Sequence, residues 1–325
     1  MFKVAITDYN FPNPDVETAL LEAEGIEVVS LKEKCPPAET AALVRDADAV
    51  ITQFATINAE VINTMERAKV IVRYGVGVDN VDLEAARQRG IPVLNIPDYC
   101  VDEVADHALA LILATTRQVV PNTLHLRAGG WGLATPITMV QSLASLTTGV
   151  IGFGRIGREV VKRLLAFNGR VLVFDPLVPA AEIAAAGAGA VASLDELLPQ
   201  CDILTPHCPS TPGTRHLFNA AAFARMKQGA VFINVTRGDL ADSDALVAAL
   251  QSGKLSSAAL DVFDPEPIPA DHPIRQMPNV ILAAHIAWAS PAAVEKLRRT
   301  AARLALMAIH GRPLPNIVNG VPVPP

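Results

Sequence analysis

The sequence is poor in charge, in aromatic residues and in long apolar runs. Of its 325 residues 18% are charged and 5% are aromatic, while 50% are hydrophobic, so a large buried core is available. The net charge is −6 and basic clusters are missing, which argues against nucleic acid as the main partner. The longest apolar run, near residues 108–114, is too short to span a bilayer. We therefore expect neither a nucleic-acid-binding protein nor a membrane protein.

Cysteine and histidine are few and scattered. The four cysteines, at positions 35, 100, 201 and 208, show no C-x-x-C spacing, and the seven histidines are also dispersed. This pattern predicts no metal site and favours reduced thiols, as in a cytoplasm. Because the first residues lead directly into a predicted strand, we expect no signal peptide and a cytoplasmic location. The length suggests two domains.

A first series of βα alternations fills residues 1–99. Short β-like runs at 2–6, 27–30, 49–52, 70–74 and 93–96 alternate with helical stretches such as 16–24 and 58–65. This alternation predicts a small parallel sheet with helices on both faces. The fourth run leads into Gly75, Val76 and Gly77, whose backbone N–H groups can hold an anion such as a carboxylate. A plain tight turn explains these glycines equally well.

A long apolar helical stretch over 101–120, between Pro97 and Pro121, is expected to connect two domains. After a loop over 127–145, a second βα series runs from about residue 148 to 284. Its six β-like runs, which match a doubly wound dinucleotide-binding sheet, lie at 149–152, 170–174, 202–205, 230–235, 257–262 and 280–284. The last predicted elements are a helix over 291–309 and a proline-rich tail over 312–325 with little regular structure.

Three glycines at G-x-G-x-x-G spacing open the second series. Gly152 permits a tight strand-to-helix turn, Gly154 leaves room for a pyrophosphate, and Gly157 lets the helix pack closely on the strand. Asp175 ends the next β-like run, where its carboxylate can accept hydrogen bonds from an adenosine ribose. A carboxylate there also repels the 2′-phosphate of NADP, and no basic residue follows it. The pattern predicts NAD as the cofactor.

Three candidate catalytic residues, Arg237, Glu266 and His285, follow three further β-like runs. Ligands of an open α/β sheet bind beyond the carboxyl ends of its strands, so we expect these side chains to converge. Imidazole can remove a hydroxyl proton as hydride leaves, and guanidinium can hold a substrate carboxylate. A carboxylate beside the histidine would favour imidazolium and orient the ring. Taken singly, each residue also has an ordinary structural explanation: Arg237 as a surface arginine, Glu266 as a solvated loop glutamate and His285 as a hydrogen-bonded core histidine.

The ordered motifs make nearly the whole chain resemble the D-isomer-specific 2-hydroxyacid dehydrogenases. The motifs are GVGVDNVD (75–82), GFGRIG (152–157), NVTRG (234–238), DVFDPEP (261–267) and HIAWAS (285–290). The resemblance implies an α/β fold of two doubly wound parallel-sheet domains with a cleft between them. A Rossmann NAD-binding domain would span 100–289, and a smaller flavodoxin-like substrate-binding domain would comprise 1–99 plus 290–325. It also implies a homodimer.

The resemblance further implies hydride transfer between NAD(H) and a small D-2-hydroxy acid/2-oxo acid pair of the glycerate/hydroxypyruvate, glyoxylate or 3-phosphoglycerate type. Arg237 would bind the substrate carboxylate, His285 would be the acid/base, Glu266 its partner, and Asp261 would contact the nicotinamide carboxamide. The implied substrate contacts are Gly75, Val76, Gly77, Arg237, His285 and Trp288. The implied cofactor contacts are Gly152, Gly154, Arg155, Ile156, Gly157, Asp175, His207, Cys208, Pro209, Thr214, Val235, Thr236, Arg237, Asp261 and His285.

Some positions depart from the common family pattern. Thr236 and Asp239 replace small residues and glycine beside the arginine, and Ala284 replaces a frequent proline. Trp288 stands where many phosphoglycerate-type members carry glycine, and in this the chain resembles the glycerate dehydrogenase/hydroxypyruvate reductase and C-terminal-binding-protein branches. Because of the resemblance to the last branch, an NAD(H)-sensing interaction protein is the alternative to an enzyme. Formate dehydrogenase pairs its histidine with glutamine, so Glu266 argues against that activity.

Overall fold

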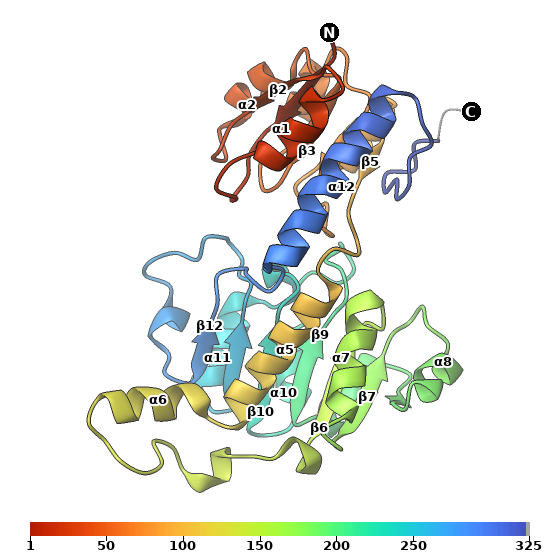
Figure 1. The fold of residues 1–325 in the computed structure, drawn as a ribbon. Coiled ribbons are helices and arrows are strands. Elements are labelled where there is room, and N and C mark those ends of the chain that lie inside the picture. Colours follow the sequence, from red (N-terminus) through yellow and green to blue (C-terminus); the bar gives the residue numbers. More distant parts are fainter. Residues whose placement is uncertain (323–325) are drawn as a thin grey trace. The chain divides into compact units, whose positions relative to one another are not determined.

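A computed structural model of the chain describes residues 1–322. The chain divides into two compact units (Figure 1). Unit 1 combines Met1–Cys100 with the segment that starts at Ser290, and unit 2 is Val101–Ala289. No helix among residues 1–322 is both long and apolar enough to cross a membrane.

The sheet of unit 1 has five parallel strands in the order β2-β1-β3-β4-β5. This is the flavodoxin-like order, in which the chain reverses direction beside the first strand. All five predicted strands are present, each within two residues of its expected ends. Their bounds are β1 Lys3–Ile6, β2 Glu27–Ser30, β3 Ala49–Thr52, β4 Ile71–Arg73 and β5 Val93–Leu94.

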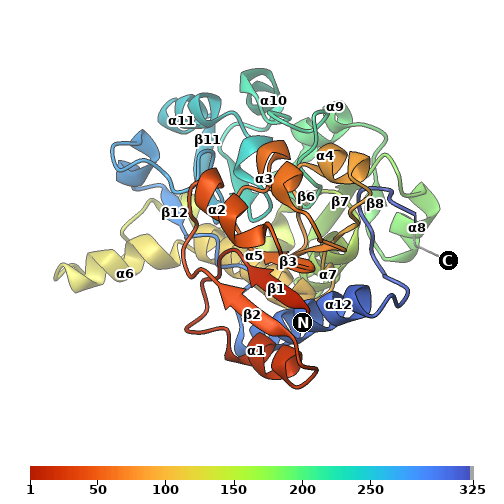
Figure 2. The ribbon, with the colours of Figure 1, turned by 90° about the horizontal axis from the view of Figure 1, so that it is seen from above.

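Three helices of unit 1 begin at polar caps. The side chains of Asn58, Asp82 and Ser290 each accept a hydrogen bond from the N–H three residues on, which satisfies a donor that a helix start leaves unpaired. The helix that begins after Ser290 lies against α1, β3 and β4 (Figure 2). The bounds are α1 Asp15–Glu22, α2 Pro37–Val44, α3 Ala59–Thr64, α4 Leu83–Gln88 and α12 Pro291–Ile309.

A buried ion pair fixes α12 to α1. Arg298 donates to both carboxylate oxygens of Glu17 at 2.7–3.0 Å, and Tyr74 Oη donates to Glu17 Oε1 at 2.6 Å. Burial, followed by the nearby Glu17 carboxylate, raises the pKa of Tyr74 well above its usual value. The carboxylate is thus fully hydrogen-bonded where water does not reach it, and the last helix is tied to the first.

The sheet of unit 2 has seven parallel strands in the order β12-β11-β10-β9-β6-β7-β8. The order reverses between β6 and β9, which makes the edge beyond those strands the expected ligand site. We expected six strands; β8 was missed because two residues give no apolar run. The bounds are β6 Thr147–Ile151, β7 Arg170–Phe174, β8 Gly189–Ala190, β9 Ile203–Pro206, β10 Ala230–Asn234, β11 Leu255–Leu260 and β12 Val280–Leu282.

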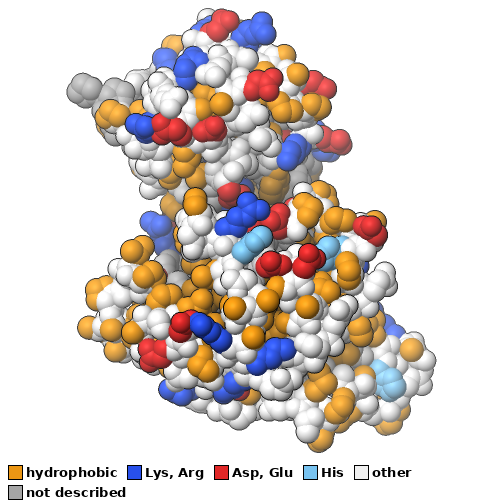
Figure 3. All heavy atoms as spheres, turned by 180° about the vertical axis from the view of Figure 1, so that it is seen from behind, with side chains coloured by type: hydrophobic (Ala, Val, Ile, Leu, Met, Phe, Trp, Pro, Cys, Tyr) orange, Lys and Arg blue, Asp and Glu red, His pale blue; other side chains and the backbone are white. Residues whose placement is uncertain are grey.

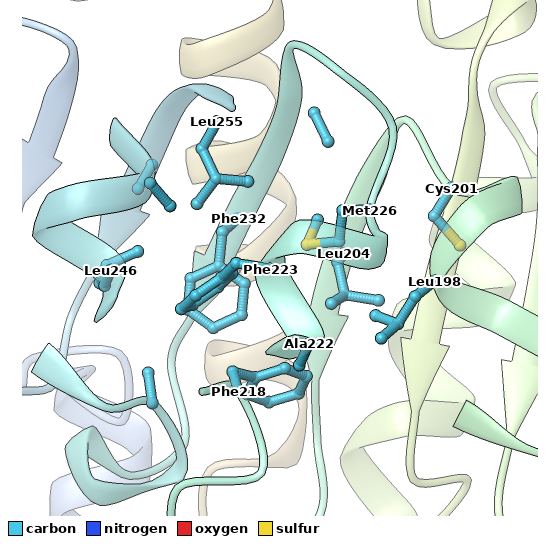
Figure 4. Close-up of a cluster of buried hydrophobic side chains, with 14 of the residues drawn as sticks. Leu198, Cys201, Leu204, Phe218, Ala222, Phe223, Met226, Phe232, Leu246 and Leu255 are labelled. Atoms are coloured by element: carbon cyan, nitrogen blue, oxygen red, sulfur yellow. The ribbon is translucent and has the colours of Figure 1, made fainter. Parts of the chain in front are cut away.

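Apolar side chains of β9, β10 and the helices packed on them form the core on one side of this sheet (Figure 4). Phe218, Phe223 and Phe232 lie at its centre with ring centroids 5.1–6.5 Å apart, a spacing that favours tilted and edge-on aromatic pairs. The helices of unit 2 are α5 Val101–Thr116, α6 Val119–Arg127, α7 Arg155–Leu165, α8 Ala180–Ala185, α9 Leu194–Leu197, α10 Ala220–Arg225 and α11 Ser243–Gln251. Short 3-10 turns occupy Ile137–Met139, Leu143–Ser145, Leu198–Gln200, Gly238–Leu240 and Pro273–Gln276.

The expected single helix over 101–120 is wrong. The chain breaks at Gln118, whose φ of 53° lies in the left-handed region, and α6 then starts at Val119. Pro121 lies in the first turn of α6 and does not end a helix. A continuous helix would bring its ring against the carbonyl four residues earlier, whereas a first turn needs no N–H at that position.

The described part of the predicted irregular tail joins the sheet of unit 1. Ile317 forms an antiparallel bridge with Leu94, and the Asn319 side chain hydrogen-bonds the backbone of Val93 and Ile91. Residues 323–325 of that predicted tail lie outside the described residues.

Candidate active site

The predicted site residues of unit 2 follow its strands in sheet order. His285 follows β12, Glu266 follows β11, Arg237 follows β10, His207 follows β9 and the glycine turn follows β6. Since all these strands are parallel, their carboxyl ends share one edge of the sheet. Residues separated by more than a hundred positions therefore line a single edge.

The histidine and glutamate form a hydrogen-bonded pair. His285 Nδ1 lies 2.8 Å from Glu266 Oε2, and Glu266 Oε1 accepts from the N–H of Phe263 at 2.9 Å. Burial by itself raises the pKa of Glu266, but the bonds from His285 and Phe263 and the charge of Arg237 outweigh it and leave the pKa below its usual value. The carboxylate is therefore ionised and orients the imidazole.

The loop that carries Arg237 is shaped by Asn234, the last residue of β10. The Asn234 side chain donates to the carbonyl of Arg237 at 2.8 Å and accepts from both the N–H and the hydroxyl of Thr236. Gly238 lies so close to the next loop that an added Cβ would stand 1.9 Å from the carbonyl carbon of Phe263. This close approach places the Arg237 loop beside the loop that holds Glu266.

The backbone at His285 is also fixed. His285 has a φ of 54°, in the left-handed region that non-glycine residues rarely adopt. Its carbonyl accepts from Trp288 Nε1 at 2.8 Å, so the predicted substrate-contacting indole is attached to the turn that carries the predicted catalytic histidine. Asp261 is fully buried, and its carboxylate accepts from the N–H groups of Ile286 and Ala287 at 2.9 Å each.

The glycine turn after β6 has the shape that a pyrophosphate site needs. A Cβ at Gly152, where φ is 92°, would stand 2.7 Å from the His207 carbonyl oxygen, and one at Gly157 would stand 2.1 Å from that of Gly152. Gly154 is different, because a Cβ there would meet nothing within 4 Å. Packing thus requires two of the glycines, whereas the third leaves open space at the start of α7, where Arg155 and Ile156 present N–H groups without intrahelical acceptors.

Asp175 follows β7 beside this turn. Its Oδ2 accepts from the N–H of Phe153 at 2.7 Å and its Oδ1 from the N–H of Leu177 at 2.8 Å. The carboxylate is partly exposed. These residues fit a dinucleotide: two glycines allow close packing, one leaves space, a helix start faces that space, and an acid stands at the next strand.

The segment after β9 is held by internal bonds. His207 Nε2 lies 3.0 Å from Thr205 Oγ1, and burial lowers the pKa of His207 to about 3, so its ring is neutral. Burial likewise raises the pKa of Cys208 to about 11. Thr214 Oγ1 donates to the Pro209 carbonyl at 2.7 Å, which closes the turn. Of the other predicted cofactor contacts, Val235 is buried at the end of β10.

The predicted substrate loop lies in unit 1, after β4. Gly75 has a φ of 149°, a backbone conformation that residues with a Cβ rarely adopt, and this favours glycine at the position. The loop is attached to the segment after β5, since Asn95 Nδ2 donates to the carbonyl of Val76 at 2.7 Å and Ile96 N–H to that of Gly75. Gly77 follows in the same loop.

Two residues that support the strand edge of unit 2 were not predicted from the sequence. Asn234 was present in the NVTRG motif but received no role, because its bonds run to backbone atoms that only the folded loop brings near. Asp239 was noted only as a departure; its Oδ2 accepts from Ser210 Oγ at 2.7 Å, which joins the segments after β9 and β10. Among residues 1–322 no cluster of three or more His, Cys, Asp or Glu is arranged to hold a metal ion.

Comparison with known proteins matches residues 109–287 to the family model described as "D-isomer specific 2-hydroxyacid dehydrogenase, NAD binding domain". Over all 325 of its residues, the chain is 36% identical to D-3-phosphoglycerate dehydrogenase from Methanocaldococcus jannaschii, and it spans 60% of the length of that relative. It is 36% identical to glyoxylate reductase from Thermofilum pendens, covering 90% of this chain and 88% of that one.

A solved structure shows the same arrangement of elements. D-lactate dehydrogenase from Aquifex aeolicus, crystallised with NAD and lactic acid, superposes with a TM-score of 0.83 at 29% identity, covering 95% of this chain and 96% of that one. The predicted fold class is confirmed both by this likeness and by the two parallel sheets.

Proposed function

The chain belongs to the D-isomer specific 2-hydroxyacid dehydrogenase family, and we propose on that basis that it is an NAD-dependent oxidoreductase of a small D-2-hydroxy acid/2-oxo acid pair. The observation that carries the proposal is the 2.8 Å hydrogen bond between His285 Nδ1 and Glu266 Oε2, at the strand edge that also presents Arg237. A charged anchor, a proton-transfer group and its orienting carboxylate are the parts this reaction needs.

NAD is the cofactor, since the match over residues 109–287 is to an NAD-binding domain. When bound, it accepts hydride in oxidation of the hydroxy acid and donates hydride in reduction of the oxo acid. The turn from Gly152 to Gly157 and the start of α7 would hold the pyrophosphate, and Asp175 would hold the adenosine ribose.

We assign proton transfer to His285. Because Glu266 accepts at Nδ1, the proton exchanged with the substrate oxygen is carried at Nε2. In reduction the imidazolium gives this proton to the oxygen of the new alkoxide, and in oxidation the neutral ring takes it from the hydroxyl. Glu266 stays ionised throughout and stabilises the imidazolium.

Binding of the substrate is proposed for three further groups. The Arg237 guanidinium would bind the carboxylate and polarise the carbonyl oxygen. In unit 1, the backbone N–H groups of Val76 and Gly77, in the loop after β4, would bind a carboxylate. Trp288, attached to the carbonyl of His285, would pack against the carbon chain of the substrate and select its length.

We also propose a cytoplasmic homodimer. Reduced thiols suit the scattered cysteines, and the family resemblance implies two copies. Support for the dimer comes from α6 and the segment after it, which project from the body of unit 2 (Figures 1 and 2). Of thirteen exposed large hydrophobic side chains among residues 1–322, seven fall between Val119 and Ile137. A second copy of the chain would cover them.

A panel of 2-oxo acids assayed with NADH tests the proposed function. Glyoxylate, hydroxypyruvate, phosphohydroxypyruvate and pyruvate are offered, and turnover of at least one is expected. His285→Ala should lower kcat by about 10²–10⁴ while NADH still binds, and Arg237→Ala should raise KM as well as lower kcat. NADH binding without turnover of any acid would reject the enzyme and favour the NAD(H)-sensing alternative, which a pull-down for partner proteins would then examine.

A further inference from the structure

Asp261 holds the turn that begins with the catalytic histidine. Its backbone carbonyl accepts from the N–H of His285 at 2.7 Å, and its two carboxylate oxygens accept from the N–H groups of Ile286 and Ala287. Three consecutive backbone donors therefore bind one residue at the end of β11. The turn position of His285 depends on where the Asp261 side chain points.

These three hydrogen bonds to Asp261 matter because His285 is held in an unfavourable backbone conformation. A φ of 54° at a residue with a Cβ is unfavourable and persists only when the surroundings fix it. The bonds to Asp261 supply that constraint on the residues immediately following. If the carboxylate rotated, the turn would lose two of its bonds, and the imidazole would lose its alignment with Glu266.

A buried carboxylate needs more compensation than two backbone amides provide. His107, on helix α5, faces it: His107 Nε2 lies 3.6 Å from Asp261 Oδ1. This nitrogen is buried and has no hydrogen-bond partner among residues 1–322, while Asp261 is fully buried. Helix α5 packs directly on β10 and β11, so the pair lies inside unit 2. A small movement would turn the contact into a hydrogen bond.

We propose that His107 is a positioning residue for His285. Its Nε2 holds the Asp261 carboxylate in the orientation that binds Ile286 and Ala287, and so fixes the catalytic turn. His107 itself touches no reacting atom. Its effect on catalysis rests on the proposed function, whereas its effect on the turn does not.

Amide hydrogen exchange at Ile286 and Ala287 tests the structural half without any turnover. The Ile286 side chain is 51% exposed, so protection of its amide depends on the bond to Asp261 rather than on depth. His107→Leu should speed exchange at both amides by about tenfold or more, because the Asp261 carboxylate then loses the imidazole that faces it and its bonds to the two amides open more often. His107→Gln should stay near the wild type, because its amide nitrogen is as many bonds from Cα as Nε2 is.

Two variants complete this design. Asp261→Asn should speed exchange as His107→Leu does. Thr116→Val removes a buried hydroxyl from the same helix, where it donates only to that helix's own carbonyls, and should change nothing. If His107→Leu does not fold, His107→Asn, whose amide stops short of Asp261, replaces it. Equal exchange in the wild type, the glutamine variant and the shortened or apolar variant would overturn the proposal.

Steady-state rates test the catalytic half. The substrate is a 2-oxo acid that the wild type reduces. The factor by which His107→Leu lowers kcat should be about ten times the factor by which it changes the KM for NADH, and His107→Gln should keep most of the wild-type rate. The same leucine change should add little in an Asp261→Asn background, since both act through one carboxylate. Fully additive losses would contradict the proposal. A wild type without turnover, but with the expected exchange pattern, would reject the proposed function and leave the role of His107 in place.

Discussion

Glu266 keeps its charge because its neighbours outweigh the cost of burial. Burial raises the pKa of this carboxyl, whereas the bonds from His285 and Phe263 lower it further than burial raises it. The group is therefore ionised from neutral pH down to below its ordinary pKa and is protonated only at more acid pH. Across the range where histidine titrates, the imidazole of His285 faces a negative charge.

Glu266→Gln should shift both pH–rate profiles in the acid direction. Without the charge imidazolium is less favoured, so the fall in 2-oxo acid reduction with rising pH should begin at lower pH. Oxidation needs the neutral ring, and its activity should extend to lower pH. Rates in both directions across pH 5–9 measure this, with a substrate found in the panel. If both profiles stay in place while NADH still binds, Glu266 is an ordinary loop carboxylate.

Asp175 combines a charge with two backbone bonds, and the two effects can be separated. Asp175→Asn removes the charge but keeps an acceptor for the N–H of Phe153 or Leu177, whereas Asp175→Ala removes both. We expect wild-type preference for NADH over NADPH, because a carboxylate repels a 2′-phosphate. The asparagine variant should narrow that preference about tenfold or more at little cost in stability.

Competing measurements of kcat/KM for NADH and NADPH, together with thermal melts, test this prediction. Asp195→Asn, which removes an exposed carboxylate that pairs with Arg225, serves as the control. Equal wild-type rates with both cofactors would show that Asp175 has no selective role.

At the scale of elements, the buried pair of Glu17 and Arg298 is what ties α12 to α1. Removing one partner of a buried ion pair leaves the other charge uncompensated, which costs about 3–5 kcal/mol. Glu17→Leu should therefore lower the free energy of unfolding of unit 1 by about that amount, as measured by denaturant titration. Tyr74→Phe, which removes a single hydrogen bond to the same carboxylate, should cost only about 1 kcal/mol.

The double variant Glu17→Leu/Arg298→Met is the decisive control. With both charges gone, no buried charge stays unpaired, and the double variant should be more stable than Glu17→Leu alone. A double variant as unstable as the sum of its single changes would mean that the two side chains contribute separately. The loss would then come from packing against α12 and not from the ion pair.

Much of the element order could be predicted because local pattern decides it. Buried parallel strands give short apolar runs between turns, and residues 1–322 contain twelve strands where eleven were expected. The strand at Gly189–Ala190 was not predicted, because two small residues give no apolar run. It forms by pairing with the edge of β7. The break at Gln118 was also hidden, because a left-handed residue three positions before Pro121 leaves no mark in hydrophobic periodicity.

Placement of the candidate site followed from a topological rule, whereas its supporting bonds did not. Residues after parallel strands meet at one edge, so Arg237, Glu266 and His285 could be assigned together. The grip of Asp261 on the next loop and the bonds of Asn234 run to backbone atoms of folded turns. No spacing in the sequence encodes them, because they depend on where two loops end in space. Their functional roles stay predictions.

At the scale of the whole molecule, the segment from Val119 to Ile137 is the main anomaly of the surface. Helix α6 has no buried residue, although most of its first turn is apolar and it also contains two leucines. Several orange apolar side chains lie among white atoms on the corresponding lobe at the lower right of Figure 3. Contiguous exposed apolar surface is typical of sites that another protein covers, and a symmetric copy is the commonest such partner.

We expect the wild type to be a dimer and Leu126→Asp to dissociate at higher protein concentration than the wild type, as measured by light scattering after size exclusion. Leu126 is 56% exposed, and burying one leucine stabilises an interface by about 1.5–3 kcal/mol, so a charge in its place should weaken dimerisation at least tenfold. Leu177→Asp is the matched control: it places the same charge on a leucine that is 90% exposed elsewhere in unit 2. That variant should stay dimeric. A monomeric wild type, or equal dissociation in both variants, would reject this segment as the interface.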